Sequence, residues 1–158
     1  MSQPTRLTGA QETSLAIAAA VVTANAYYIH PIIAEVADYF GVSHSRIGLV
    51  PALNQIALAV GIFLLLPLGD RISNRRLTIT FAAGQTASIA LMAIAQGFTL
   101  FVIGSTMLGF FTIAPYLLPA YASKRVAPER LGQVTAKLAA GVILGILVAR
   151  VGAGVVAE

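Results

Sequence analysis

A short charged segment between two long apolar stretches is the part of this 158-residue chain with the clearest electrostatic chemistry. It reads Leu66-Pro67-Leu68-Gly69-Asp70-Arg71-Ile72-Ser73-Asn74-Arg75-Arg76, so that an acid and three arginines fall within seven residues. A basic loop between two segments that are long enough to cross a bilayer fixes the side of the membrane on which the loop lies. Its arginines can also bind the anionic headgroups of lipids.

Polar side chains inside the apolar stretches are the second group of candidates, because they cost free energy in a bilayer unless they pair or line a wet cavity. Ser105, Gly109, Thr112 and Tyr116 recur at offsets of 4, 7 and 11 residues, which places them on one helical face. This face either lines a cavity or, through its small members, packs closely against a neighbouring helix. Gln55, in the second apolar stretch, is a further polar candidate.

The first apolar stretch carries polar residues on two faces. Asn25, Tyr28 and Glu35 share one helical face, and Tyr27 and His30 lie on nearly the opposite one. Both faces cannot point into one cavity. We expect Asn25 and Tyr28 to do so, because an amide in hydrocarbon has the greatest need of a partner.

Two further side chains could carry charge within the apolar stretches. His30 is a candidate carrier of a coupling proton, since histidine changes its charge near neutral pH, although its place beside Pro31 at a helix end also fits a structural role. Arg150 lies in the last apolar stretch, where a buried arginine costs about 2.5–3.5 kcal/mol. A cavity role or a salt bridge at the outer surface, with Glu35 or Asp38 as partner, would offset that cost.

The composition requires a membrane to position these residues. The chain is 58% hydrophobic and 10% charged, with a mean hydropathy of +0.85, whereas about a quarter of the residues in a soluble domain are charged. There is no cysteine, which excludes disulfides, thiolate metal sites and thiol catalysis. The net charge of +4 lies in loops and forms no basic face, so we expect no nucleic-acid partner.

Five apolar segments are long enough to cross a bilayer, which takes about 20 helical residues. We predict spans near residues 14–37, 46–68, 77–96, 99–122 and 134–156, within a single all-α domain that covers residues 1–158. The turn between the third and fourth spans is expected at Gln96-Gly97-Phe98-Thr99, with Thr99 as the helix cap. Prolines at or within the spans predict kinks.

The distribution of lysine and arginine predicts the orientation. Eight of the ten positive residues lie at the N-terminus or in the second and fourth loops, whereas the first loop has only Arg46 and the third has none. Because positive residues concentrate in cytoplasmic loops, we expect a cytoplasmic N-terminus in the plasma (inner) membrane. Five spans then place the C-terminus outside.

The order of helix, short loop, helix and Gly-Asp-Arg loop resembles the N-terminal half of the major facilitator superfamily. The family signature of this loop is roughly G-x-L-a-D-r-x-G-r-k, and Leu68, Gly69, Asp70, Arg71 and Arg75 match it. The segments Asn25-Ala26-Tyr27-Tyr28-Ile29-His30-Pro31 and Pro128-Glu129-Arg130-Leu131-Gly132-Gln133 also resemble family patterns, the former together with Gln55 those of bacterial efflux-type members.

The resemblance departs from the family pattern at two positions that matter for proton coupling. Ser105 stands where proton-coupled members carry an arginine, four residues before Gly109. In the fifth-helix antiporter signature Gly141 and Gly145 match, but Ile146 replaces the proline. These differences weaken the expectation of proton-coupled efflux and leave the family resemblance intact.

The resemblance implies a role for each group of candidates. Asp70, Arg71 and Arg75 would form a cytoplasmic gate in which Asp70 meets a helix of the other half of the carrier, whereas Arg76 would serve only as a positive loop residue. Helices one and four line the cavity in such carriers, so the implied substrate contacts are Asn25, Tyr28, Gln55, Thr112 and Tyr116. The implied activity is secondary transport of a small solute by alternating access.

The length of the chain leaves its activity open. Family members typically have twelve helices in two halves, and this chain covers five. It is expected to be a truncated product, with a half-carrier that pairs with a second chain, or a non-transporting membrane fragment, as alternatives. A membrane enzyme subunit is the rival from another class, but no paired carboxylates, metal-ligand spacing or nucleotide loop support it. We expect no catalytic residue, metal or cofactor.

Overall fold

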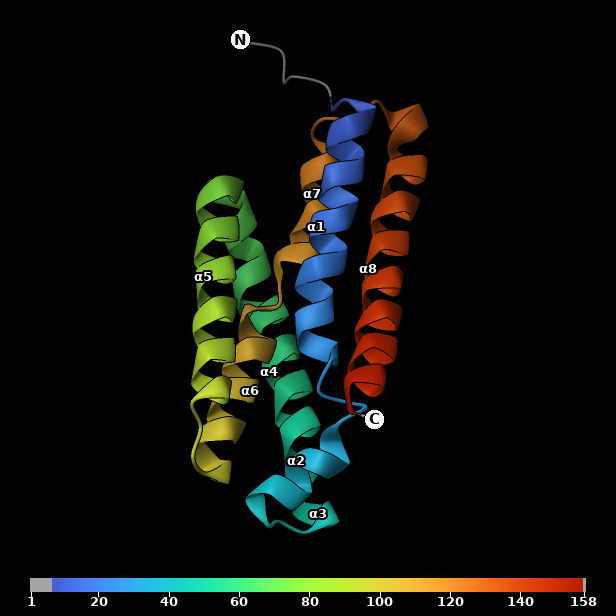
Figure 1. Ribbon diagram of the computed structural model, residues 1–158. Coiled ribbons are helices and arrows are strands. Elements are labelled where there is room, and N and C mark those ends of the chain that lie inside the picture. The colour runs from blue at the N-terminus through green and yellow to red at the C-terminus, as the bar shows by residue number, and fades with distance from the viewer. Residues whose placement is uncertain (1–6, 158) are drawn as a thin grey trace.

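The computed structural model describes residues 7–157, except for the side chains of Asp70, Asn74, Val156 and Ala157. This part of the chain is entirely helical, with eight α-helices, one 3-10 helix and no strand (Figure 1). In chain order the helices are α1 (Gly9–Tyr27), α2 (Ile33–Phe40), α3 (His44–Ile47), α4 (Leu49–Leu65), η1 (Leu66–Asp70), α5 (Asn74–Ala93), α6 (Phe98–Phe111), α7 (Ala114–Ser123) and α8 (Pro128–Ala157). The predicted all-α class is confirmed.

The long helices run up and down an elongated bundle (Figure 1). α1 descends from the N-terminal end, α4 returns, α5 descends, α6 and α7 ascend together, and α8 descends beside α1. The η1–α5 and α7–α8 connections therefore lie at one end, which we call the basic end because it carries most of the lysines and arginines. α2, α3 and the α5–α6 connection lie at the opposite end.

Helices occupy all five predicted regions, but two of them are broken. The region predicted as one helix over 14–37 contains α1, a turn at residues 28–32, and α2. Pro31 explains this turn, because proline has no N–H to donate and disfavours helical geometry in the residue before it. The region 99–122 is divided between α6 and α7, and Thr112 and Ile113 form a turn.

Capping residues set several of the remaining helix ends. The Thr8 side chain caps α1 by accepting from the N–H of Gln11, and the Gln11 side-chain oxygen accepts from the N–H of Thr8. α1 therefore begins before the predicted span. Gly41 ends α2 with a φ of +61°, a conformation that favours glycine. The expected cap at Thr99 is wrong: Gly97 precedes α6, which begins at Phe98.

Among residues 7–157, three helical segments are long and apolar enough to cross a membrane, namely His44–Gly69, Phe98–Ser123 and Pro128–Val155. α1 and α5 are as long as a span but contain more polar residues, so they are not apolar enough to meet the same criterion. Large apolar side chains are nevertheless exposed along every long helix, such as Ile17 on α1, Phe63 on α4 and Ile79 on α5. Soluble monomers rarely expose so much apolar surface, so this exposure is typical of a membrane protein.

The helices pack in two groups. α4 and α5 both pack against α6, whereas α1, α7 and α8 pack against one another. The break at Thr112 is therefore the point where one continuous stretch of chain passes from the first group to the second, as Figure 1 shows. Ile113 is fully buried there, against Leu77, Phe81 and Leu117.

α1 and α8 approach each other closely because two glycines face the α1 backbone. A Cβ added to Gly141 would lie 2.4 Å from the carbonyl oxygen of Ala16, and one on Gly145 would lie 2.2 Å from that of Ala20. Both distances are far shorter than a van der Waals contact. Small residues at these positions therefore let α8 pack closely on the α1 backbone.

This contact predicts that Gly145→Ala destabilises the bundle. The new methyl group would force α1 and α8 apart, at a cost of about 1–3 kcal/mol in the free energy of unfolding. Gly152→Ala on the same helix is the matched control, because nothing lies within 4 Å of a Cβ at that position. Both variants gain the same helix propensity, about 1 kcal/mol. Equal unfolding midpoints for the two variants in detergent, followed by circular dichroism, would contradict the packing argument.

Candidate functional site

The charged segment folds as a tight turn at the basic end. η1 ends at Asp70, and the N–H groups of Arg71 and Ile72 donate to the carbonyl oxygen of Leu68, at 3.0 and 2.8 Å. Gly69 lies against α7, since a Cβ there would be 3.0 Å from Cδ2 of Leu117. The motif glycine thus lets the turn pack on α7. The side chain of Asp70 lies outside the described residues.

The two basic loops meet at this end. Arg75 is exposed and lines an open pocket of about 730 Å³ together with Lys124 and Arg125 from the α7–α8 connection. The guanidinium carbon of Arg125 lies 4.0 Å from the centroid of the Tyr121 ring, a cation–π contact. Arg71 is exposed. The structure therefore brings positive groups of two distant segments together, which favours an anionic counterpart at this surface.

The small members of the predicted polar face pack α6 against α4. A Cβ on Gly109 would lie 2.1 Å from the carbonyl oxygen of Asn54, and Asn54 Nδ2 donates to the carbonyl oxygen of Ser105 at 2.7 Å. Asn54 is 1% exposed, whereas its neighbour Gln55 is half-buried and has no side-chain hydrogen bond to the described residues. The buried amide of this contact is therefore Asn54, which the sequence analysis had not named.

A second buried amide, Gln85 on α5, is the centre of a polar network. Its Nε2 donates to the hydroxyl of Thr112 at 2.9 Å and to the carbonyl oxygen of Val22 at 3.1 Å. Its Oε1 accepts a longer hydrogen bond, 3.5 Å, from Asn25 Nδ2. Gln85 and Thr112 are 4% and 2% exposed. The sequence analysis missed Gln85, although an amide in the middle of an apolar stretch was the available signal.

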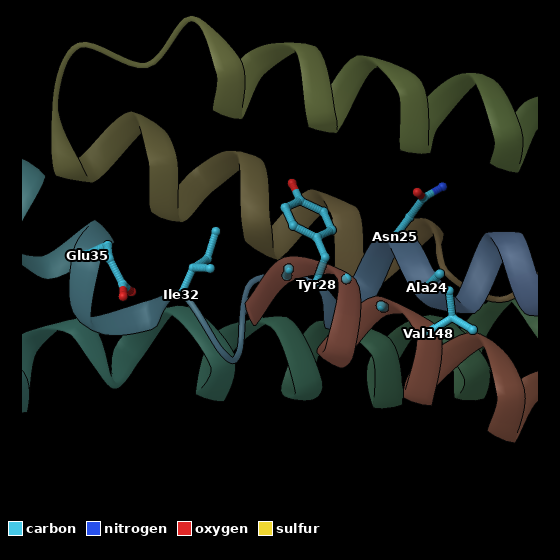
Figure 2. Close-up of a pocket in the computed structure, with 9 residues that line it drawn as sticks. Ala24, Asn25, Tyr28, Ile32, Glu35 and Val148 are labelled. Atoms are coloured by element: carbon cyan, nitrogen blue, oxygen red, sulfur yellow. The ribbon is translucent and has the colours of Figure 1, made fainter. Parts of the chain in front are cut away.

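Asn25 and Tyr28 line an open pocket between α1 and the second half of α8. The pocket has a volume of about 620 Å³, and its other lining residues include Glu35, Val148 and Ala149. Figure 2 shows Asn25 and Tyr28 extending from the chain toward the same side, with Glu35 contributed by α2. The predicted pairing of Asn25 with Tyr28 on one face therefore agrees with the geometry.

The remaining predicted contacts lie elsewhere. Thr112 is buried in the Gln85 network, and Tyr116 is 43% exposed on α7, so neither lines the pocket that contains Asn25 and Tyr28. Gln55 is on α4 and does not line it. The five predicted substrate contacts therefore do not share one site, since only Asn25 and Tyr28 line this pocket.

His30 and Arg150 differ in their surroundings. The ring of His30 stacks on that of Tyr27 with centroids 5.3 Å apart, and its Nδ1 lies 3.2 Å from the Tyr27 carbonyl oxygen. These contacts are typical of a helix-end histidine in a structural role. Arg150 is exposed on α8, and among the described residues it forms no ion pair with Glu35 or Asp38.

A buried carboxylate joins α1 to α8 at the basic end. Glu12 has a side chain that is only 6% exposed, and its Oε1 accepts a hydrogen bond of 2.8 Å from Nη2 of Arg130. Lys137 Nζ lies 4.0 Å from the other carboxylate oxygen. From the sequence these two basic residues were expected only as part of a cytoplasmic loop, and Glu12, which precedes the first predicted span, was not predicted to pair with them.

The fold and these sites define a multi-pass helical membrane protein. A profile described as Major Facilitator Superfamily matches residues 15–158. The chain therefore belongs to the major facilitator superfamily, a family of membrane transporters, and not to an enzyme family. No group of three histidine, aspartate or glutamate side chains suited to a metal ion occurs among the described residues.

The chain is also similar to curated proteins of Escherichia coli. It is 29% identical over 124 residues to the uncharacterized transporter YgaY of strain K12, and equally to the YgaY protein of O157:H7. The alignment covers 78% of this chain and 32% of each relative, so the chain spans about a third of their length. No solved structure matches the chain.

The ion pair predicts that Glu12→Gln weakens the contact between α1 and α8. The loss should be about 1–2 kcal/mol, below the 3–5 kcal/mol of a fully buried pair, because the Arg130 side chain is 52% exposed and partly solvated. Glu129→Gln is the control. Like Glu12 on α1, Glu129 lies in the first turn of its helix, α8, but it is exposed and has no partner among the described residues. Unfolding in detergent should separate the two variants. Equal midpoints would show that the Glu12 pair contributes nothing.

Proposed function

We propose that this chain forms the N-terminal half of a secondary transporter that moves a small solute by alternating access. The family match over residues 15–158 is the observation that carries the proposal. The arrangement of the basic end supports it, because the Gly69–Asp70–Arg71 turn packs on α7 where a gate between two halves of a carrier would close. More specifically, the carrier would export the solute in a step coupled to the movement of protons.

The gate in this proposal comprises Asp70, Arg71 and Arg75. Asn25 and Tyr28, which line the pocket between α1 and α8, would contact the solute. Gln55, Thr112 and Tyr116 do not line this pocket, so they would contact the solute only in another conformation of the carrier. In the proton-coupled form, His30 would carry the proton. Arg150 would act in the cavity or in an outer ion pair that the rest of the carrier completes.

All five helical regions cross the plasma (inner) membrane in this proposal, with the basic end in the cytoplasm. α5 has twenty residues and spans about 30 Å, the thickness of the hydrocarbon core. Its polar residues Gln85 and Ser88 are buried against other helices, so they do not meet lipid. α1 is likewise shielded along the face that carries Thr23. These two helices can therefore span the membrane despite their polar composition.

The second half of the pathway would come from elsewhere, because the chain spans about a third of the length of its relatives. Either residues beyond these 158 or a separate chain would supply it. A non-transporting membrane fragment is the alternative. Sequencing the locus past the codon for Glu158 separates the two sources: further spans in any frame indicate a longer parent, and none indicates a partner chain.

The proposed topology predicts an alternating pattern of chemical labelling. Because the chain has no cysteine, single cysteines can be placed at Ser45, Ser73, Gln96, Gln133 and Gly154. In intact cells a membrane-impermeant maleimide should label positions 45, 96 and 154, and it should reach 73 and 133 only after permeabilisation. If α5 did not span the membrane, positions 73 and 96 would label alike, and if α1 did not span it, position 45 would not be labelled from outside unless the whole pattern were inverted; either result would contradict the proposed topology.

The gate proposal predicts a difference between two neighbouring arginines. Uptake of labelled amino acids, sugars and lipophilic cations is measured in membrane vesicles from cells that express the chain, either alone or together with the second half of the carrier. Vesicles from cells that express neither half are the reference. For any solute that moves, Asp70→Asn and Arg75→Gln should lower transport about tenfold or more, the size of a typical coupling between sites. Arg76→Gln should leave it unchanged. The absence of transport under both conditions, with the protein present in the membrane, would contradict the proposed function.

A further inference from the structure

The break between α6 and α7 lies in the interior of the bundle, not at its surface. Thr112 is 2% exposed and Ile113 is fully buried. The N–H of Thr112 donates to the carbonyl oxygen of Gly109 and that of Tyr116 to Ile113, so both bonds span three residues instead of four. In a regular helix the carbonyl group of Phe111 would accept from residue 115, but Pro115 has no N–H. The interruption is therefore built into the sequence.

A broken helix at this depth needs polar partners, because hydrocarbon offers none. Gln85 supplies one from α5, through the bond of its Nε2 to the hydroxyl of Thr112. That hydroxyl in turn donates to the carbonyl oxygen of Leu108 at 2.7 Å. The Thr112 hydroxyl thus accepts from Gln85 and donates to the Leu108 carbonyl oxygen, which in a regular helix would accept from the N–H of Thr112.

The orientation of the Gln85 amide follows from its other partner. The carbonyl oxygen of Val22 on α1 can only accept, so Nε2 must face it, and the two N–H groups of Nε2 serve Val22 and Thr112. A flipped amide would set its oxygen against the Val22 oxygen. One side chain therefore fixes α1, α5 and the break relative to one another.

Close packing reinforces the arrangement. A Cβ on Gly84, the neighbour of Gln85, would lie 2.5 Å from atoms of the Phe111 ring, so the last residue of α6 rests on the α5 backbone. α7, on the other side of the break, packs against α1 and α8. The break is thus the joint between the two helix groups, and the Gln85 amide bridges the joint.

We propose that Thr112–Ile113 is a hinge between α6 and α7, and that Gln85 is a positioning residue that locks it to α1. While the Gln85 amide is hydrogen-bonded to Thr112, α7 keeps one angle relative to α6. The bond of the same amide to Val22 holds α1 at this point. When the amide leaves Thr112, α7 can change its angle together with α8. In the proposed transporter this release would accompany the change of access. The hinge itself belongs to the fold and does not depend on transport.

Amide hydrogen exchange of the chain in lipid nanodiscs tests the lock. Gln85→Met keeps the approximate volume and removes every hydrogen bond of the amide. Loss of the two Nε2 bonds should raise exchange at residues 112–116 about five- to thirtyfold, while exchange in α4 stays unchanged. Thr86→Val is the matched control, because Thr86 is exposed on the same helix and bonds only to the carbonyl oxygen of Ala82.

A mutant cycle separates the lock from general destabilisation. Thr112→Val should raise exchange as Gln85→Met does, whereas Thr112→Ser should behave like the wild type. In the variant that carries both Gln85→Met and Thr112→Val, the rise in exchange should be much smaller than the sum of the two single effects. Additive effects, a rise spread evenly over all helices, or no change at residues 112–116 would each overturn the proposal.

Spin labels give a second readout that mere stability would not change. Cysteines at Thr99 and Ser123, both exposed and on either side of the hinge, can be labelled uniquely because the chain has no cysteine of its own. The wild type should give one narrow distance distribution, and Gln85→Met a broad or double one. An equally narrow distribution in Gln85→Met would refute the hinge even if exchange had risen. These outcomes do not involve solute, so they are independent of the transport proposal.

Discussion

A polypeptide inside a bilayer has no water with which to satisfy its backbone, and this constraint shapes the whole chain. It explains why every regular element of the described residues is a helix and why most irregular segments lie at the two ends of the bundle. The break at Thr112 is the interior exception. It is tolerated because Thr112 and Ile113 are buried in protein, and because the Thr112 hydroxyl, which Gln85 holds, bonds the Leu108 carbonyl oxygen in place of the lost backbone N–H.

Helix association in lipid depends on close contact and on polar groups, since burial of apolar surface gains little when the alternative is a lipid tail. The bundle shows both. Gly141 and Gly145 bring α8 onto the backbone of α1, and Gly109 brings α6 onto α4. The amides of Asn54 and Gln85 lie between helices in the same regions. Glu12 and Arg130 join α1 to α8 at the basic end, in partial contact with water.

The candidate site shows what could be predicted from sequence and what could not. Asn25 and Tyr28 were expected on one face and do line one pocket, because helical periodicity alone relates positions three residues apart. Gln85 and Asn54 were missed, since periodicity does not reveal which neighbouring helix a polar residue meets. Thr112 was expected in a cavity with Tyr116, but Thr112 is buried at the break between α6 and α7, whereas Tyr116 is exposed on α7.

The sequence by itself determined the helical class, the family and the concentration of positive charge at one end, because these follow from local composition, motif spacing and the cost of burying charge in lipid. Only the tertiary structure decided how the helices group, which buried amide meets which carbonyl group, and that Glu12 pairs with Arg130, 118 residues away. Such contacts depend on the relative rotation and approach of helices. These are set by the sum of many weak packing contacts and not by any single segment.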